Sequence, residues 1–248
     1  MTVWYMNGAG NDFAVVDARN INIDMSDMAR GLCERRGCDG FMALDNSSIA
    51  DFKLHFYNSD GSRAEMCGNG ARCICRFAYD NGIASEQMTV ETDAGIVEGE
   101  RIGERIYRVR LNTPRDITLN KRDGVDYCIV GVPHAVIKVD ESDFADEDKL
   151  LGRARALRAE LNANVNFYSR ADENTVKIMT YERGVEDFTL ACGTGSGAVA
   201  RILFERGSVG GNSVTLQNQG GDLTVTMTSD GALYLEGGAE VDEIGEII

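Results

Sequence analysis

Two short sequences of the same form, CGNG at residues 67–70 and CGTG at residues 192–195, each open an apolar run of the kind found in helices. Both runs end at a glycine, and Gly82 and Gly207 each follow the cysteine of their own run by 15 residues. One CGxG sequence can arise by chance, but similar flanks at equal spacing indicate a repeated unit. A chain built from two such units has to bring two equivalent helix starts, each with a thiol, into one fold.

The repeat extends beyond the glycine motifs. Further pairs at nearly the same offset are Tyr57 with Tyr181, Thr89 with Thr215, and Gly95 with Gly221. We therefore expect two domains of similar structure, at residues 1–115 and 124–240. The polar, turn-rich segment 113–124 is the expected junction, and the C-terminal tail is free to pack back on the first half.

The secondary-structure pattern favours strands over helices, which predicts an α+β fold. Alternating or β-branched runs predict strands at residues 13–17, 52–57, 88–92, 107–111, 135–139, 176–181, 214–216, 223–227 and 233–236. Helices are expected at residues 25–33, 70–80, 144–161 and 197–206. The second and fourth of these helices are apolar around most of their circumference, so each is expected at the centre of its half, wrapped by mostly antiparallel strands.

Composition excludes several classes of function. A net charge of −15 disfavours nucleic acid and anionic membrane surfaces as partners. The N-terminus lacks the pattern of a signal peptide and no apolar run is long enough to span a bilayer, so a cytoplasmic protein is expected. Seven cysteines without a CxxC pair, and only two histidines, indicate reduced thiols and no metal site. An exposed strand edge in either half could support a homodimer.

Cysteines at two helix N-termini suggest proton-transfer chemistry. A free thiol with a pKa of about 8.5 is only slightly ionised at neutral pH, and a helix N-terminus stabilises its anion by roughly 0.3–1 kcal/mol. The glycines leave backbone N–H groups bare, where they can bind a carboxylate. A thiolate and a thiol on opposite sides of a bound carboxylate could invert a carbon atom. The alternative is that both cysteines are buried caps, which the duplication disfavours.

Longer segments carry a resemblance to a known family. The sequences FYNSDGSRAEMCGNGARC and YERGVEDFTLACGTG closely resemble the two signature segments of diaminopimelate epimerases, and MNGAGNDF resembles that family's opening. The likeness covers both halves. It implies two pseudo-symmetric domains, each a mostly antiparallel β-structure around a central helix, and an amino-acid epimerase that uses neither pyridoxal phosphate nor another cofactor.

The resemblance also implies roles for individual residues. Cys67 and Cys192 match the acid and base cysteines, and Glu182 and His134 match further catalytic positions. The matching substrate-binding residues are Asn11, Asn58, Gly68, Asn69, Asn164, Glu182, Arg183, Gly193 and Thr194. The asparagines could instead be turn residues, the Glu182–Arg183 pair a solvated one, and His134 a structural imidazole.

The chain departs from the family pattern in places that bear on the substrate. Val132 replaces an asparagine expected to contact the distal end of the substrate, and Phe188 lies where a glutamate is usual. Asn7 replaces a histidine, and the segment 35–42 is shorter than its counterpart. The expected reaction is conversion of L,L- to meso-diaminopimelate, in the synthesis of lysine and peptidoglycan precursors. Racemisation of histidine or another basic or diamino acid is the alternative, and a non-catalytic carboxylate binder or a thiol redox protein is a remoter one.

Overall fold

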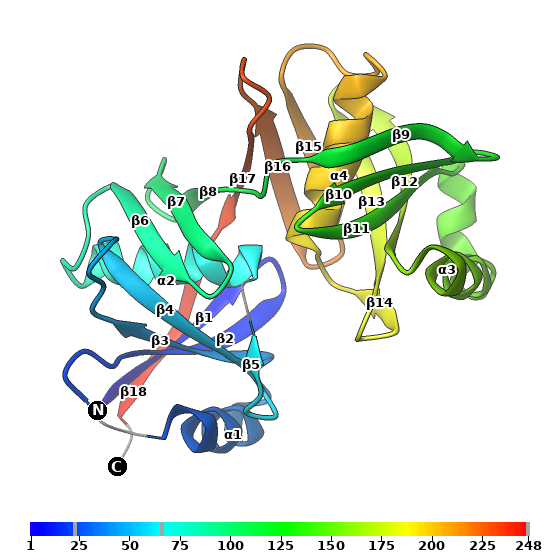
Figure 1. Cartoon of the computed structure of the whole chain (residues 1–248). Helices are drawn as coiled ribbons and strands as arrows, with labels where there is room; N and C mark the ends of the chain where they lie inside the picture. The colour runs from blue at the N-terminus through cyan, green and yellow to red at the C-terminus, as the bar shows by residue number, and fades with distance from the viewer. Residues whose placement is uncertain (22–23, 65–66, 247–248) are drawn as a thin grey trace. The chain divides into compact units, whose positions relative to one another are not determined.

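The computed structural model describes residues 1–21, 24–64 and 67–246 of the chain. It divides into two compact units (Figure 1). The first consists of Met1–Arg110 together with Gly237–Ile248, and the second of Leu111–Glu236. Each unit contains both strands and helices, so the predicted α+β fold is confirmed.

The first unit is a sheet that surrounds a helix. Its strands are β1 (Thr2–Gly8), β2 (Asn11–Asp17), β3 (Gly40–Asp45), β4 (Phe52–Asn58), β5 (Arg63–Ala64), β6 (Gln87–Thr92), β7 (Gly95–Arg101), β8 (Ile106–Arg110) and β18 (Glu240–Glu246). They pair in the order β18-β1-β2-β3-β4-β6-β7-β8, with β5 added to β4. The pairs β2–β3 and β4–β6 are parallel and the other pairs are antiparallel. Its helices are α1 (Met25–Arg36) and α2 (Gly68–Asp80).

The second unit is built in the same way. Its strands are β9 (Arg115–Arg122), β10 (Val125–Val130), β11 (Val132–Lys138), β12 (Asn164–Asp172), β13 (Thr175–Glu182), β14 (Asp187–Thr189), β15 (Ser213–Asn218), β16 (Gly221–Met227) and β17 (Leu233–Gly238, up to Glu236 in this unit). They pair in the order β9-β10-β11-β12-β13-β15-β16-β17, with β14 added to β13. The parallel pairs are β11–β12 and β13–β15. Its helices are α3 (Glu147–Leu161) and α4 (Gly193–Glu205), and a 3₁₀ helix, η1 (Glu141–Ala145), precedes α3.

The two units therefore share one strand order, with parallel pairs at the same two places. Helix α1 connects the first parallel pair in one unit and α3 connects it in the other. The helices α2 and α4 are both 13 residues long, and Gly82 and Gly207 follow them with positive φ angles of 66° and 58°. The outermost strand of each sheet comes from a different part of the chain. In the first unit, β18 from the C-terminal tail pairs with β1, whereas in the second unit β9, which directly precedes β10 in the chain, pairs with β10. The internal repeat predicted from the two CGxG motifs is thus a repeat of fold.

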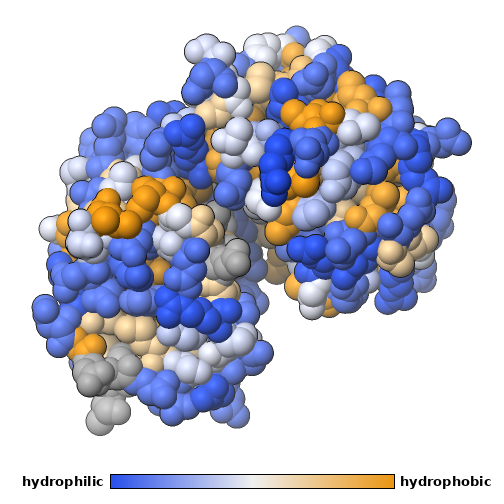
Figure 2. Space-filling model, in the orientation of Figure 1, coloured by the Kyte–Doolittle hydropathy of each residue, from blue (hydrophilic) through white to orange (hydrophobic). Residues whose placement is uncertain are grey.

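The central helices are buried, and most of their residues are small or apolar. Helix α2 packs against β1, β2, β3, β7 and β8, and α4 packs against β10, β11, β12, β15 and β16. The large apolar side chains of α4, Val199, Ile202 and Leu203, are almost completely buried. Figure 2 accordingly shows a face that is mostly hydrophilic, with hydrophobic residues in scattered groups. Within the described ranges, no helix has the length and hydropathy needed to cross a membrane.

Several elements differ from the sequence-based expectation. Segment 113–124, expected to be a junction, contains β9, and the division between the units falls between Arg110 and Leu111. The helix expected at 144–161 begins only at Glu147, because the Asp146 side chain accepts a hydrogen bond from the Lys149 N–H and caps a new helix after η1. Strand β3 was missed because its sequence, GFMALD, is apolar on both faces and lacks alternation.

Candidate active site

In the first unit, the predicted site residues gather at one edge of the sheet. The strand register places Phe13, Gly40 and Asn58 in one row across β2, β3 and β4. Asn11 is the first residue of β2, so it lies beside that row. Its side chain donates to Asp39 at 3.2 Å and accepts a hydrogen bond from the Asn69 side chain at 2.7 Å. Asn69 belongs to the first turn of α2, and this bond therefore ties the helix start to the sheet edge.

The start of α2 carries the first cysteine. Cys67 is the N-cap residue, with extended backbone angles, and its side chain is half-buried. Gly68 and Asn69 follow it as buried residues of the first turn, where backbone N–H groups have no partner inside the helix. The end of β1 packs tightly here, since a Cβ atom on Gly8 would lie 2.9 Å from the Asn69 carbonyl oxygen. A thiol and the N-terminal turn of a helix are thus held at one fixed position.

The second unit repeats this arrangement with different side chains. The register pairs His134 of β11 with Asn164 of β12, and Val165 with Tyr181, so Glu182 lies at the same edge. Glu182 thereby occupies the place that Asn58 has in the first unit. Cys192 is the N-cap residue of α4, is 5% exposed, and accepts a hydrogen bond at Sγ from the Gly195 N–H at 3.4 Å.

Glu182 lies next to the second cysteine. Burial raises the pKa of its carboxyl group, while hydrogen bonds from Thr189 and Cys192 lower it in part. The Thr189 hydroxyl donates to Glu182 at 2.5 Å. The adjacent Arg183 is fixed through its backbone, whose N–H donates to the Asn164 side chain at 2.8 Å. The structure therefore brings Glu182, Arg183, Asn164 and Cys192 into one region, in which Asn164 holds the turn.

His134 is completely buried, and burial lowers the pKa of its imidazole to about 3. The ring is consequently neutral at physiological pH. Its Nδ1 accepts a hydrogen bond from the Asn166 side chain at 3.2 Å, and the same Asn166 amide donates to the Ala135 carbonyl at 2.9 Å. The Thr180 hydroxyl donates to Asn166 Oδ1 at 3.0 Å. Since Asn166 Oδ1 also lies against Gly195, this network supports the first turn of α4.

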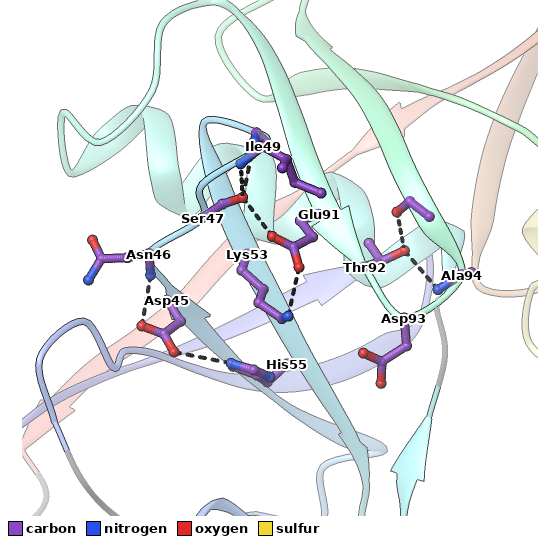
Figure 3. A network of polar contacts seen from close by, with 12 residues as sticks. Asp45, Asn46, Ser47, Ile49, Lys53, His55, Glu91, Thr92, Asp93 and Ala94 are labelled. Carbon is purple, nitrogen blue, oxygen red and sulfur yellow. Dashed lines mark hydrogen bonds and ion pairs between the residues drawn. The ribbon is translucent and has the colours of Figure 1, made fainter.

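The other histidine belongs to a separate polar network in the first unit (Figure 3). His55 Nε2 lies 3.2 Å from Asp45, and its Nδ1 lies 3.1 Å from the Arg63 guanidinium. Beside it, Glu91 accepts hydrogen bonds from Ser47 at 2.6 Å and Lys53 at 2.7 Å. This network fixes the loop after β3 against β4 and β6. Among the described residues, no three His, Cys, Asp or Glu side chains are grouped in a way that could hold a metal ion.

Comparison with known proteins identifies the family. A protein-family model described as "Diaminopimelate epimerase" matches residues 3–108 and 127–241. The chain belongs to the diaminopimelate epimerase family. Membership makes it an isomerase, as the resemblance of the two signature segments predicted.

Curated relatives support this assignment over nearly the whole chain. A protein named diaminopimelate epimerase from Aquifex aeolicus is 37% identical, over 93% of this chain and 91% of its own length. Relatives of the same name from Alkaliphilus metalliredigens and Archaeoglobus fulgidus are 35% and 37% identical, over 95% and 94% of this chain and 93% and 91% of their own lengths.

Solved structures with low identity share the fold. A phenazine biosynthesis protein of the PhzF family from Bacillus anthracis has a TM-score of 0.76 at 16% identity, covering 100% of this chain and 99% of that one. A hydroxyproline epimerase from Agrobacterium vitis has a TM-score of 0.70 at 16% identity, covering 100% and 90%. These likenesses show the epimerase-like fold expected for a member of the family.

Two departures from the family pattern have a structural setting. Phe188 packs edge-on against Phe167 and Tyr181, with ring centroids 6.3 and 5.9 Å away, so it extends the core of the second unit. Val132 is the first residue of β11 and pairs with Val130 across the turn. Both positions are thus apolar where the family pattern led us to expect a polar side chain.

Sequence reasoning missed Asn166 and Thr180, although the third asparagine of NANVNF, which lies between Val165 and Phe167, was the available signal for Asn166. Asn166 makes three buried hydrogen bonds, so Asn166→Ala would remove the side-chain partner of His134 Nδ1 and of the Thr180 hydroxyl. We expect this change to lower the free energy of unfolding by about 2–3 kcal/mol. Urea denaturation measures it, with Asn212→Ala as the control, because Asn212 is exposed and makes one side-chain bond, to the Met227 carbonyl. A loss no larger than that of the control would contradict the role assigned to Asn166.

Proposed function

We propose that this epimerase interconverts L,L- and meso-diaminopimelate, with Cys67 and Cys192 as the two proton-transferring groups. The observation that carries the proposal is their equivalence: each is the N-cap residue of a 13-residue central helix, at the same place in two units of one topology. Curated relatives named diaminopimelate epimerase at 35–37% identity support the substrate. The reaction would serve the synthesis of lysine and of peptidoglycan precursors.

The proposed reaction is an exchange of one proton for another. The thiolate of one cysteine takes the α-proton, and the electron pair of the C–H bond passes into the α-carboxylate. The thiol of the other cysteine gives its proton to the opposite face of the carbon, which inverts the centre and leaves this second cysteine as the thiolate. Backbone N–H groups of the first turns, at Gly68 and Asn69 and at Gly193 and Thr194, would hold the carboxylate while its charge increases. The chemistry needs no cofactor.

Other residues would position the substrate. Asn11, which bonds Asn69 at the first helix start, and Asn58, whose amide donates to the Ser62 hydroxyl at 3.0 Å, lie at the sheet edge and would contact a polar group of the substrate. Asn164 fixes the turn that presents Glu182 and Arg183. Arg183 suits a planar carboxylate, which it can bind through two parallel N–H donors. Neutral His134 would act through Asn166, by supporting the start of α4, and its direct participation in proton transfer has less support because its ring is buried.

Val132 favours a second candidate substrate. A site that hydrogen-bonds the distal end of diaminopimelate would strongly reject analogues without that group. An apolar side chain at residue 132 removes one such contact and fits another basic or diamino acid, or histidine. The mechanism would be unchanged, because the two cysteines and the helix starts contact only the α-carbon and its carboxylate.

Proton NMR in heavy water tests both candidates. We expect the α-proton signal of L,L-diaminopimelate to disappear and the meso isomer to form, because each inversion introduces a solvent deuteron. Histidine, lysine, arginine and 2,4-diaminobutyrate are run in parallel. If one of these amino acids exchanges its α-proton and diaminopimelate does not, the enzyme is a racemase of that amino acid. No exchange from any of them under reducing conditions would contradict the proposal and favour a carboxylate binder or a thiol redox protein.

A further inference from the structure

Arg72, in the second turn of α2, is the largest fully buried side chain of the described protein. Arg72 is 0% exposed, and its guanidinium donates to two backbone carbonyl oxygens. Nε donates to the Gly238 carbonyl and Nη1 to the Gly68 carbonyl, both at 3.4 Å. Its Nη2 has no hydrogen-bond partner among the residues that the structure describes. No carboxylate within residues 1–21, 24–64 and 67–246 forms an ion pair with it. A buried cation without an anion is costly, so an anion that forms only in the working enzyme is the natural partner.

The side chain of Arg72 reaches back toward the start of α2. Helical side chains lean toward the N-terminus, and the bond to the Gly68 carbonyl places the guanidinium beside the residue that directly follows Cys67. Burial lowers the pKa of the Arg72 guanidinium, while the thiols of Cys73, Cys67 and Cys75 act in the opposite direction. An arginine nevertheless keeps its charge in proteins.

Only one of these three thiols is suited to ionise. Burial raises the pKa of Cys73 and of Cys75 to about 12, so both stay protonated at neutral pH. Cys67 is half-buried and is the N-cap residue of the helix, at the end of α2 where the helix dipole favours an anion. Of the three thiols near Arg72, Cys67 is therefore the one whose anion the positive charge of Arg72 can stabilise.

The other charged side chains described near this part of α2 are an arginine that is paired with carboxylates and an aspartate. Arg76 forms ion pairs with Asp80 at 3.2 Å and Glu240 at 3.6 Å. Asp242 on β18 has its pKa raised by burial, and by the nearby Asp12 and Glu240 carboxylates. Among the described residues of this region, Arg72 is the cation that no carboxylate pairs with.

The second unit has no such cation. Gly197 occupies the position in α4 that Arg72 has in α2, and a Cβ atom there would lie 2.5 Å from Leu111 Cδ1. Cys192 instead hydrogen-bonds the Glu182 carboxylate. A buried cation therefore accompanies one cysteine and a carboxylate the other, which makes two otherwise equivalent helix starts electrostatically different.

We propose that Arg72 is a positioning residue that stabilises the thiolate of Cys67 and so makes Cys67 the ionised cysteine of the resting enzyme. The inference rests on the proposed function, in which one cysteine must begin as the base. In this proposal the difference in ionisation between Cys67 and Cys192 is caused by Arg72, which does not contact the substrate.

The test is the pH dependence of iodoacetamide alkylation, followed at each cysteine by mass spectrometry. In the wild-type enzyme we expect the midpoint for Cys67 to lie below the ordinary thiol value of about 8.5. In Arg72→Met it should rise by about one unit, so that the rate at neutral pH falls about tenfold. Arg72→Lys, which keeps the charge, should restore most of the rate. Arg76→Met is the matched control on the same helix, and Cys192 is the control within each molecule.

Cys73 and Cys75 are buried, so their alkylation would show that the first unit has partly unfolded. If Arg72→Met unfolds the unit in this way, Arg72→Gln is used as the neutral variant in place of Arg72→Met. A wild-type midpoint for Cys67 at or above the ordinary value would overturn the inference, as would an unchanged midpoint in a folded neutral variant or an equal shift at Cys192. Because alkylation needs no turnover, this result is independent of the proposed function, which fails separately if the wild-type enzyme exchanges no α-proton.

Discussion

Cys67→Ala and Cys192→Ala are each expected to lower kcat/KM for inversion of the α-carbon by about a thousandfold, since a positioned acid or base contributes roughly 10²–10⁴ in rate. Each direction of the reaction needs both groups, one to remove a proton and one to return it. The double variant should therefore be hardly slower than either single variant, because residues that act as a unit are not additive. Chiral chromatography of the products measures the inversion.

Cys128→Ala provides the control for this experiment. Cys128 is a completely buried thiol of β10 in the second unit, and burial raises its pKa to about 12. Its replacement should leave kcat/KM within about twofold and cost only the small loss of stability that follows removal of one buried atom, about 1 kcal/mol. Substantial inversion by Cys67→Ala or Cys192→Ala, with the control unchanged, would show that a different group transfers the proton.

The fold could be predicted from the sequence to the extent that it is repeated. The two motifs, with Gly82 and Gly207 at equal distances, defined the central helices, and the structure has both at 13 residues with left-handed glycines after them. Strands with alternating patterns, such as β4 and β13, were also predicted. Strands that are buried on both faces, such as β3, could not be told from other apolar runs, and β9 was hidden because most of its side chains are exposed and polar.

For the candidate site, sequence motifs indicated which residues to consider but not how they are held. Asn11 and Asn69 were both expected to contact substrate, but the bond between them at 2.7 Å is a tertiary contact that no local pattern encodes. The same applies to Asn166, whose partners come from β11 and β13. Burial of Arg72 was equally hidden, since an arginine within a helix is usually solvated. The roles of the predicted site residues stay predictions until the variants are measured.

Gly195→Ala is expected to have the second largest effect, because the fourth residue of CGTG has no space for a side chain. A Cβ atom on Gly195 would lie against Asn166 Oδ1 and 3.0 Å from the Thr180 hydroxyl. The first turn of α4 would have to move, or the bond between Asn166 and Thr180 would have to break. Since the Gly195 N–H also donates to Cys192 Sγ, the thiol would move with it. Displacement of a catalytic group by about 1 Å can cost about a hundredfold in rate, and overpacking costs about 1–3 kcal/mol of stability.

Two matched glycines separate this effect from that of glycine replacement in general. Gly70 has the same position in CGNG, but a Cβ atom there would meet the flexible Met42 side chain at 3.2 Å, so Gly70→Ala should cost less than about tenfold in rate, well below the hundredfold expected for a displaced thiol. Gly152, exposed in α3, has open space, and Gly152→Ala should stabilise the protein by about 0.5–1 kcal/mol without changing turnover. Steady-state kinetics and urea denaturation of the three variants measure both quantities. Equal losses of kcat/KM in Gly70→Ala and Gly195→Ala would show that the CGxG motif itself requires glycine at its fourth residue. The predicted difference would show instead that the requirement at Gly195 comes from the hydrogen-bond network of Asn166, which only the second unit contains.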